Sequence, residues 1–196
     1  MRFLLLFLLF NSFIMLSHTK HSSHASAEWQ IEAYGSAAPS FIGNYATIIG
    51  GNGEVLHEGT NGWTCQAGNA RPFPKMGWAD AHDAMPLCMD ENAVKFMNGQ
   101  QDKMTGDGWA WMLHGDVGED NTTPGVLNKK DSTPGQWIES GPHMMLMPKD
   151  AKTIAHMSDD FTVGAPYVMM PNTPIAHVMI PLSGYYVYQP ESNPKN

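Results

Sequence analysis

Two short apolar segments carry the side chains in this sequence that are best suited to chemistry. One reads GPHMMLMP and contains His143 and Met145, and the other reads PIAHVMIP and contains His177 and Met179. Successive side chains of a strand point to opposite faces, so each histidine shares a face with the methionine two positions later. If the two strands pair in one sheet, we expect all four side chains on one face, with the imidazoles close enough to share a ligand or a metal ion.

Imidazole combined with thioether is a soft set of metal ligands, which suits Cu(I) better than Zn²⁺ or Mg²⁺. Only two of the 15 methionines precede residue 28, so the remainder of the chain is rich in thioethers. We therefore take His143, Met145, His177 and Met179 as a candidate site for a soft metal ion, with copper as the leading cofactor. Methionine also fills irregular cores without any metal, so plain packing is an alternative explanation of the composition.

Two other functions fit the same histidines. An unperturbed histidine has a pKa of about 6.5, so His143 or His177 would suit general acid–base catalysis in a secreted enzyme. Ser140, Asp116 and Glu139 are the candidate partners, but their spacing matches no specific triad and no activated nucleophile is evident. Alternatively, both histidines begin core strands and hydrogen-bond to loop backbone, in a structural domain or in one that binds a small ligand without metal.

The N-terminus has the features of a signal peptide. Arg2 supplies a positive start, residues 3–16 form an almost uninterrupted apolar run, and Ala25-Ser26-Ala27 offers small residues to a peptidase. The apolar run of about 14 residues is shorter than the roughly 20 needed to span a bilayer. We therefore predict a signal peptide over residues 1–27, a mature chain from Glu28, and a secreted or periplasmic protein without a stable membrane anchor.

The charge of the chain disfavours nucleic-acid partners. The formal net charge is −8, and removal of residues 1–27 takes away Arg2 and Lys20 and no acidic residue, which gives −10. Contacts to phosphate need a basic face, so we expect no binding to nucleic acid. The composition does not specify a partner protein or a small ligand.

Cys65 and Cys88 are the only cysteines in the sequence. An even count in an exported protein favours a disulfide bond, which would close a loop of about 24 residues and stabilise the fold by about 3 kcal/mol in the chain-entropy model. The alternative is a pair of thiolate metal ligands, for which C-x-x-C spacing is more usual.

The apolar and turn-forming residues predict one domain over residues 28–188, α+β or mainly β, built around an antiparallel sheet with one main helix and long loops. The predicted elements are a hairpin of strands at 45–49 and 54–57, a helix at 91–101 capped by Asp90, and a strand at 109–113 that carries Trp109, Trp111 and Leu113 on one, more buried face. Loops are predicted at 59–87 and 116–135. Residues 189–196 are predicted to be a disordered tail.

The two predicted loops carry further candidates. Asp80, His82 and Asp83 combine an imidazole with two carboxylates, although metal ligands normally come from more than one segment. Asn121-Thr122-Thr123 is a glycosylation sequon, which has meaning only in a eukaryotic source.

Five segments together resemble a family of uncharacterised exported bacterial proteins. They read TNGWTC (60–65), MPLCMD (85–90), WMLHG (111–115), GPHMM (141–145) and YVMMPNTPIAHVMIP (167–181), so the likeness covers roughly residues 45 to 182. The resemblance implies export and the pairing of Cys65 with Cys88, and it implies no activity. The family has a tryptophan in place of Met170, an aromatic residue in place of Ile175, and T-D-P in place of Thr122-Thr123-Pro124, so an aromatic wall of the family's site would be altered here.

Overall fold

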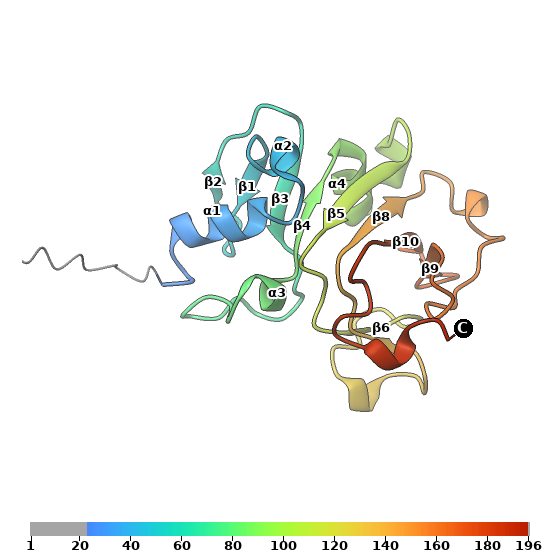
Figure 1. The fold of residues 1–196 in the computed structure, drawn as a ribbon. Coiled ribbons are helices and arrows are strands. Elements are labelled where there is room, and N and C mark those ends of the chain that lie inside the picture. The colour runs from blue at the N-terminus through green and yellow to red at the C-terminus, as the bar shows by residue number, and fades with distance from the viewer. Residues whose placement is uncertain (1–22, 196) are drawn as a thin grey trace, which may run out of the picture.

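The structure, a computed structural model, describes residues 23–195, and its centre is an eight-stranded sheet (Figure 1). The strand order is β2-β1-β3-β4-β5-β8-β10-β9, and β6 and β7 form a separate two-stranded sheet. The strands are β1 (Thr47–Ile49), β2 (Val55–His57), β3 (Thr64–Ala67), β4 (Pro86–Met89), β5 (Gly108–Met112), β6 (Glu119–Asp120), β7 (Trp137–Ile138), β8 (His143–Met147), β9 (Tyr167–Met169) and β10 (His177–Pro181). The α-helices are α1 (Ala27–Gly35), α2 (Ser40–Gly43), α3 (Ala81–Ala84) and α4 (Glu91–Met97), and short 3₁₀ turns are η1 (Gln101–Lys103), η2 (Lys129–Asp131), η3 (Ala151–Thr153) and η4 (Pro190–Ser192).

The large sheet is mixed, because β1 and β3 run parallel while every other neighbouring pair is antiparallel. The α-helices within residues 23–195 are short, and only α1 and α4 have seven residues or more. The protein is therefore a single α+β domain dominated by β structure, which confirms the predicted fold class. The parallel β1–β3 pair is the one departure from the predicted antiparallel sheet.

The predicted helix forms as α4. It begins at Glu91, where the Asp90 side chain accepts a hydrogen bond from the Ala93 amide at 2.7 Å. The helix ends at Met97 rather than at residue 101, because Gly99 follows in the left-handed conformation (φ +66°) that glycine adopts without strain.

The predicted hairpin forms from β1 and β2, and β5 covers most of the predicted strand at 109–113. The better buried face of β5 is not the predicted one: Ala110 and Met112 are buried, whereas Trp109 is 38% exposed and Trp111 is half-buried. The prediction favoured the tryptophans because of their large apolar area. Met112, on the other face of β5, lines the candidate pocket, whereas neither tryptophan does.

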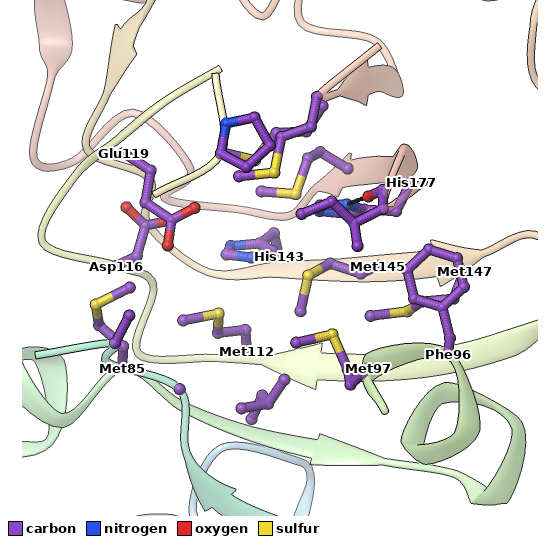
Figure 2. Close-up of a pocket in the computed structure, with 18 of the residues that line it drawn as sticks. Met85, Phe96, Met97, Met112, Asp116, Glu119, His143, Met145, Met147 and His177 are labelled. Atoms are coloured by element: carbon purple, nitrogen blue, oxygen red, sulfur yellow. Dashed lines mark hydrogen bonds between the residues drawn. The ribbon is translucent and has the colours of Figure 1, made fainter. Parts of the chain in front are cut away.

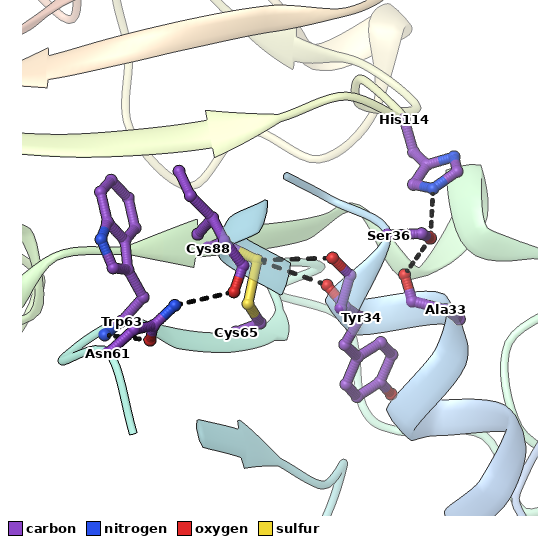
Figure 3. Close-up of a disulfide and its surroundings, with 10 residues drawn as sticks. Ala33, Tyr34, Ser36, Asn61, Trp63, Cys65, Cys88 and His114 are labelled. Carbon is purple, nitrogen blue, oxygen red and sulfur yellow. Dashed lines mark hydrogen bonds between the residues drawn. A yellow bond between two sulfur atoms is a disulfide. The ribbon is translucent and has the colours of Figure 1, made fainter. Parts of the chain in front are cut away.

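The predicted loop at 59–87 contains a central strand of the sheet. β3 lies between β1 and β4, and Cys65 of β3 is directly opposite Cys88 of β4. The two cysteines form a disulfide bond beside Tyr34 at the end of α1 (Figure 3), which confirms the predicted pairing and leaves no thiolate for a metal. The strand is hard to predict because it has only four residues and its partners come from distant segments.

Three buried clusters pack against the sheet in the described chain, and the two larger ones lie on opposite faces. α1 and α2 cover the face that carries Ile48, Cys65 and Cys88. α4 packs on the other face, where a larger core is dominated by methionine side chains of β4, β5, β8, β9 and β10. The candidate histidine and methionine residues belong to this second face.

Most of the predicted signal peptide, residues 1–22, lies outside the described residues. In the described part, Ser26 is the N-cap of α1, and its hydroxyl accepts a hydrogen bond from the Trp29 amide at 3.2 Å. No helix within residues 23–195 is both long and apolar enough to cross a membrane.

The C-terminal segment departs from the predicted tail. Gln189 and Ser192 are buried, and the Gln189 side-chain amide donates to the backbone of β7 at 3.1 Å. The predicted disorder therefore does not begin at residue 189, because this polar side chain is satisfied inside the fold.

Candidate functional site

The register of four neighbouring strands places both histidines among methionines. Directly opposed residues on adjacent strands share a face, with Cβ atoms about 5 Å apart. Three of the opposed pairs on this face bring a methionine beside a histidine or beside another methionine, namely His143–Met112, Met145–Met179 and His177–Met169. Each imidazole therefore has a thioether beside it, and a pair of thioethers lies between them.

All four candidate side chains lie on one face, as side-chain alternation predicts. The register, however, sets His143 opposite Pro181, which is four residues beyond His177. Four residues correspond to roughly 14 Å along an antiparallel strand, and the Met145–Met179 pair fills the interval. The expectation that the two imidazoles share one ion directly is therefore not met, and each ring has its own surroundings.

These side chains line a pocket with a volume of about 390 Å³ (Figure 2). The methionines that face it are Met85, Met97, Met112, Met145, Met147, Met169, Met170 and Met179. The carboxyl groups of Asp116 and Glu119 lie beside the His143 ring at one end, while His177 and Met147 lie toward the other (Figure 2). The carboxyl oxygen atoms are thus confined to the His143 end, whereas thioethers occur along the whole pocket, including Met85 near Asp116 (Figure 2).

Both imidazoles have a fixed tautomer. The Nδ1 of His143 lies 2.8 Å from the carbonyl oxygen of Gly141, and the Nδ1 of His177 lies 2.8 Å from that of Ile175. A carbonyl oxygen only accepts, so each Nδ1 carries the proton and donates it. Each Nε2 keeps its lone pair, which is the state in which histidine binds a metal ion or accepts a hydrogen bond from a ligand.

Desolvation favours the neutral form of both rings, although His177 is only half-buried. His143 is fully buried, and no residue in the described part of the chain hydrogen-bonds to its Nε2. Desolvation lowers the pKa of His143 to about 4, although the hydrogen bond to Gly141 opposes this effect. Desolvation also lowers the pKa of His177, and a charge on His143 would lower it further. Protons therefore compete little for either Nε2 near neutral pH.

Asp116 and Ser140 pack behind His143. The Ser140 hydroxyl donates to the Asp116 carboxylate, and its oxygen lies 3.4 Å from the Nδ1 of His143. Asp116 also accepts a hydrogen bond from the Gly118 amide at 2.9 Å. Two of the candidate partners do meet, but on the Nδ1 side, whereas a nucleophile would have to face the Nε2 lone pair. Glu139 takes no part, because it accepts a hydrogen bond from a tryptophan indole at 2.8 Å.

Two glycines allow this close packing. Gly115 has a φ of +68°, and a Cβ there would collide with the Ser140 carbonyl oxygen. A Cβ on Gly141 would collide with the carbonyl oxygen of Gly184. A side chain at Gly115 would therefore push the segment after β5 away from His143, and one at Gly141 would push away the segment after β10.

Glu119 presents its carboxyl group to the pocket, and it forms neither a salt bridge nor a hydrogen bond with another described side chain. Desolvation raises the pKa of Glu119 to about 7, the negative charge of Asp116 adds to the effect, and Arg71 partly opposes it. The pKa of the fully buried Asp116 is also raised, mainly by desolvation. This end of the pocket is therefore short of positive charge.

A tightly bonded segment between β6 and β7 covers the pocket. Asp120 is buried and accepts hydrogen bonds from Thr122, Thr123 and Thr133. Burial alone would raise the pKa of Asp120, but these bonds outweigh it and hold the pKa at about 2. Asn121 is fully buried and its side-chain amide donates to a distant backbone carbonyl at 2.9 Å. Residues 116–121 of the predicted loop are buried or half-buried, whereas most of residues 122–135 are exposed as predicted, and the sequon asparagine is buried in the folded protein.

Two of the pocket methionines have left-handed backbone conformations. Met85 has a φ of +51° and Met170 a φ of +55°, a region that long L side chains rarely occupy. The Met170 amide is held there by a 2.6 Å hydrogen bond to the Asn121 carbonyl oxygen. Strained residues of this kind cluster at binding and catalytic sites.

The second predicted cluster has structural roles. Asp80 caps α3 by accepting a hydrogen bond from the Asp83 amide at 2.8 Å, and Asp83 accepts one from the Ala79 amide at 3.0 Å. His82 stacks on Tyr188, with ring centroids 3.8 Å apart. Over residues 23–195, no three histidine, cysteine or carboxylate side chains are grouped so as to hold a metal ion.

Three pocket residues have no distinguishing signal in the sequence. Asp116 and Glu119 fall in a polar, glycine-containing stretch that is typical of an exposed loop. Met112 lies on the strand face opposite the tryptophans, which are the stronger local signal. Only pairing information between β5 and β8 would have placed these side chains beside His143.

Comparisons of the chain with known protein families, with curated proteins and with solved structures each found no match. The geometry and chemistry of the pocket are therefore the basis for its interpretation.

Proposed function

We propose that this protein is an exported binding protein for a soft metal ion, and that Cu(I) is the ion its pocket fits best. The observation that supports this most is at the His177 end, where an imidazole with a free Nε2 lies directly opposite Met169 and shares a face with Met179. Met147 lines the same pocket. One neutral imidazole and several thioethers make a soft donor set without a carboxylate.

The donor chemistry fits harder ions less well. Structural zinc sites use cysteine, histidine and carboxylate ligands, and Ca²⁺ or Mg²⁺ sites use oxygen. Both cysteines are bonded to each other, and the pocket carboxylates lie beside His143 rather than beside His177. His143, Met145 and Met112 would continue the donor set along the same face.

Export is supported by the N-terminal segment, by the disulfide and by the family resemblance. Residues 1–27 have the charge, apolar run and small residues of a cleaved signal. The Cys65–Cys88 bond is of the kind that persists in oxidising compartments. A soft-ion site would be suited to such a compartment, where free thiols do not compete for the ion.

Acid–base catalysis by either histidine has less support. A general base works best when its pKa is near the operating pH, and burial lowers the pKa of His143 to about 4. The serine nearest to that ring is fully buried and hydrogen-bonded to Asp116. It is therefore poorly placed to become a nucleophile.

The test is an anaerobic titration of the mature protein with Cu(I) against a chromogenic Cu(I) chelator, with ascorbate as reductant so that the disulfide survives. Met169→Leu and Met179→Leu keep the side-chain volume and remove the sulfur, so they separate ligation from packing. We expect wild-type protein to retain Cu(I) and each variant to lose at least about 10-fold in affinity.

Met104→Leu is the matched control, because Met104 is a buried methionine outside the pocket. It should bind Cu(I) as wild type does. The proposal fails if wild-type protein yields all of its Cu(I) to the chelator, or if all three leucine variants bind equally.

A further inference from the structure

Two polar groups at the acidic end of the pocket have no protein partner. The Nε2 of His143 is fully buried, has a fixed lone pair and receives no hydrogen bond from a described residue. The Glu119 carboxyl group lines the same pocket and is likewise unpaired within the described chain. A buried acceptor without a donor costs about 1–3 kcal/mol, so the Nε2 of His143 is expected to meet a ligand, and the half-buried Glu119 carboxyl group lines the same pocket.

We propose that this end of the pocket binds the ammonium group of a small organic cation whose apolar body lies among the methionine side chains. An ammonium group has three N–H donors and no acceptor, which matches a site made only of acceptors. The carboxylate of Glu119 and the Nε2 of His143 would each accept one hydrogen bond. The negative charge of Asp116 would add to the attraction without direct contact.

A hard metal ion is a poorer occupant. Asp116 already accepts hydrogen bonds from Ser140 and Gly118, so few of its lone pairs remain. Ca²⁺ needs six to eight oxygen ligands and Mg²⁺ a near-ideal octahedron, and the described side chains at this end do not supply them. An anion is excluded by the two carboxyl groups and by the neutral imidazole.

The one nearby cation is otherwise engaged. The Arg71 guanidinium donates to the Asn69 side chain at 3.3 Å and to the Leu127 carbonyl oxygen. It lowers the pKa of Glu119 from a distance but makes no salt bridge with it. The positive charge that this end lacks must therefore come from the ligand.

The remainder of the pocket suits an aliphatic body. Leu87, Met112 and Met145 are among the apolar side chains that line it. Its volume of about 390 Å³ lies in the range of small-molecule sites, which are mostly apolar with a few convergent polar groups. A straight-chain primary amine is a small probe that has both an ammonium group and an aliphatic body.

This proposal can be tested apart from copper binding, although His143 belongs to both proposed sets of contacts. Thioethers do not bind an ammonium group, and a carboxylate is a poor ligand for Cu(I). Glu119→Gln should therefore leave Cu(I) binding unchanged, and Met169→Leu, which keeps an apolar side chain of similar volume, should weaken amine binding far less than Glu119→Gln does. Each proposal can therefore fail in its own binding experiment while the other proposal still holds.

The experiment is isothermal titration calorimetry of metal-free protein at pH 8 with hexylammonium, hexanol and hexanoate as probes. Hexylammonium should bind saturably with a Kd of about 1 mM or below, and the other two should bind at least about 10-fold more weakly. Glu119→Gln should weaken hexylammonium binding about 10- to 100-fold. Glu58→Gln is the control: it changes an exposed carboxylate next to β2, the edge strand at the other end of the sheet from β9, and it should not alter hexylammonium binding.

A second measurement needs no variant. The groups that face Glu119 are Asp116, Arg71 and His143, and in the free pocket its pKa is raised to about 7. Ammonium binding favours the carboxylate, so binding at pH 6 should release a proton, measurable as a heat that depends on the ionisation enthalpy of the buffer. Equal binding of hexanol, or unchanged binding of hexylammonium by Glu119→Gln, would each overturn the assignment.

Discussion

Replacing His143 with leucine should change how the stability of the metal-free protein depends on pH. The ring is fully buried, and desolvation lowers its pKa from 6.5 to about 4. Between these pH values the unfolded chain binds a proton that the folded protein does not, so stability rises with pH through this window. The contribution is complete above about pH 6.5 and is lost as the pH falls toward 4. The difference of about 2.5 pH units corresponds to about 3 kcal/mol.

The His143→Leu variant lacks this linkage. The free energy of unfolding of wild type minus that of the variant should therefore fall by about 3 kcal/mol between pH 7 and pH 4. At pH 7 the variant loses a buried nitrogen without a partner but also leaves the Gly141 carbonyl oxygen without its donor; each effect is worth about 1–3 kcal/mol, so the two proteins should have similar stability.

Urea unfolding at pH 4, 5, 6 and 7, followed by tryptophan fluorescence with chelators present, measures this difference. The raised pKa values of Asp116 and Glu119 give a pH dependence of opposite sign, but both proteins contain them, so they cancel in the subtraction. Replacement of His57, an exposed histidine on β2, is the control. Parallel pH curves for wild type and His143→Leu would refute the assignment of a buried, neutral imidazole.

Three further outcomes are expected. The double variant Cys65→Ala/Cys88→Ala should lose about 3 kcal/mol of stability and about 6–12 °C in Tm by calorimetry, because it removes a bond between cysteines 23 residues apart in the sequence. An unchanged Tm would contradict the presence of the disulfide bond. N-terminal sequencing of exported protein should return Glu28 as the first residue. A longer chain that retains Ser26 should be about 1 kcal/mol more stable toward urea than the chain that begins at Glu28, because the Ser26 side chain caps α1. Asn121→Ala should cost about 1–3 kcal/mol in the same assay, because its buried hydrogen bonds are lost; a variant as stable as wild type would show that this side chain is exposed.

Elements with a local signal were predictable from the sequence. Asp90 marks the start of α4 because a short acidic side chain satisfies free amides at a helix N-terminus. The glycines at 50–53 mark the β1–β2 hairpin because they permit a tight turn. β3 has no such signal, since its four residues become a strand only between β1 and β4.

The acidic end of the pocket was not predictable for a related reason. Asp116 and Glu119 belong to a sequence that is polar enough for a surface loop. Their burial arises because Gly115 and Gly141 let two segments approach within van der Waals contact. Contact between residues so far apart in the chain has no local pattern.

The sequence by itself determined that His143, Met145, His177 and Met179 would share one face if their strands paired, because side-chain alternation is a local property with a period of two. The export-type N-terminus and the two cysteines likewise predicted the disulfide. Only the tertiary structure decided the register, which sets the histidines four residues apart with a methionine pair between them. Register and burial depend on free energies of packing between distant segments, and these decide which polar atoms are left to face a ligand.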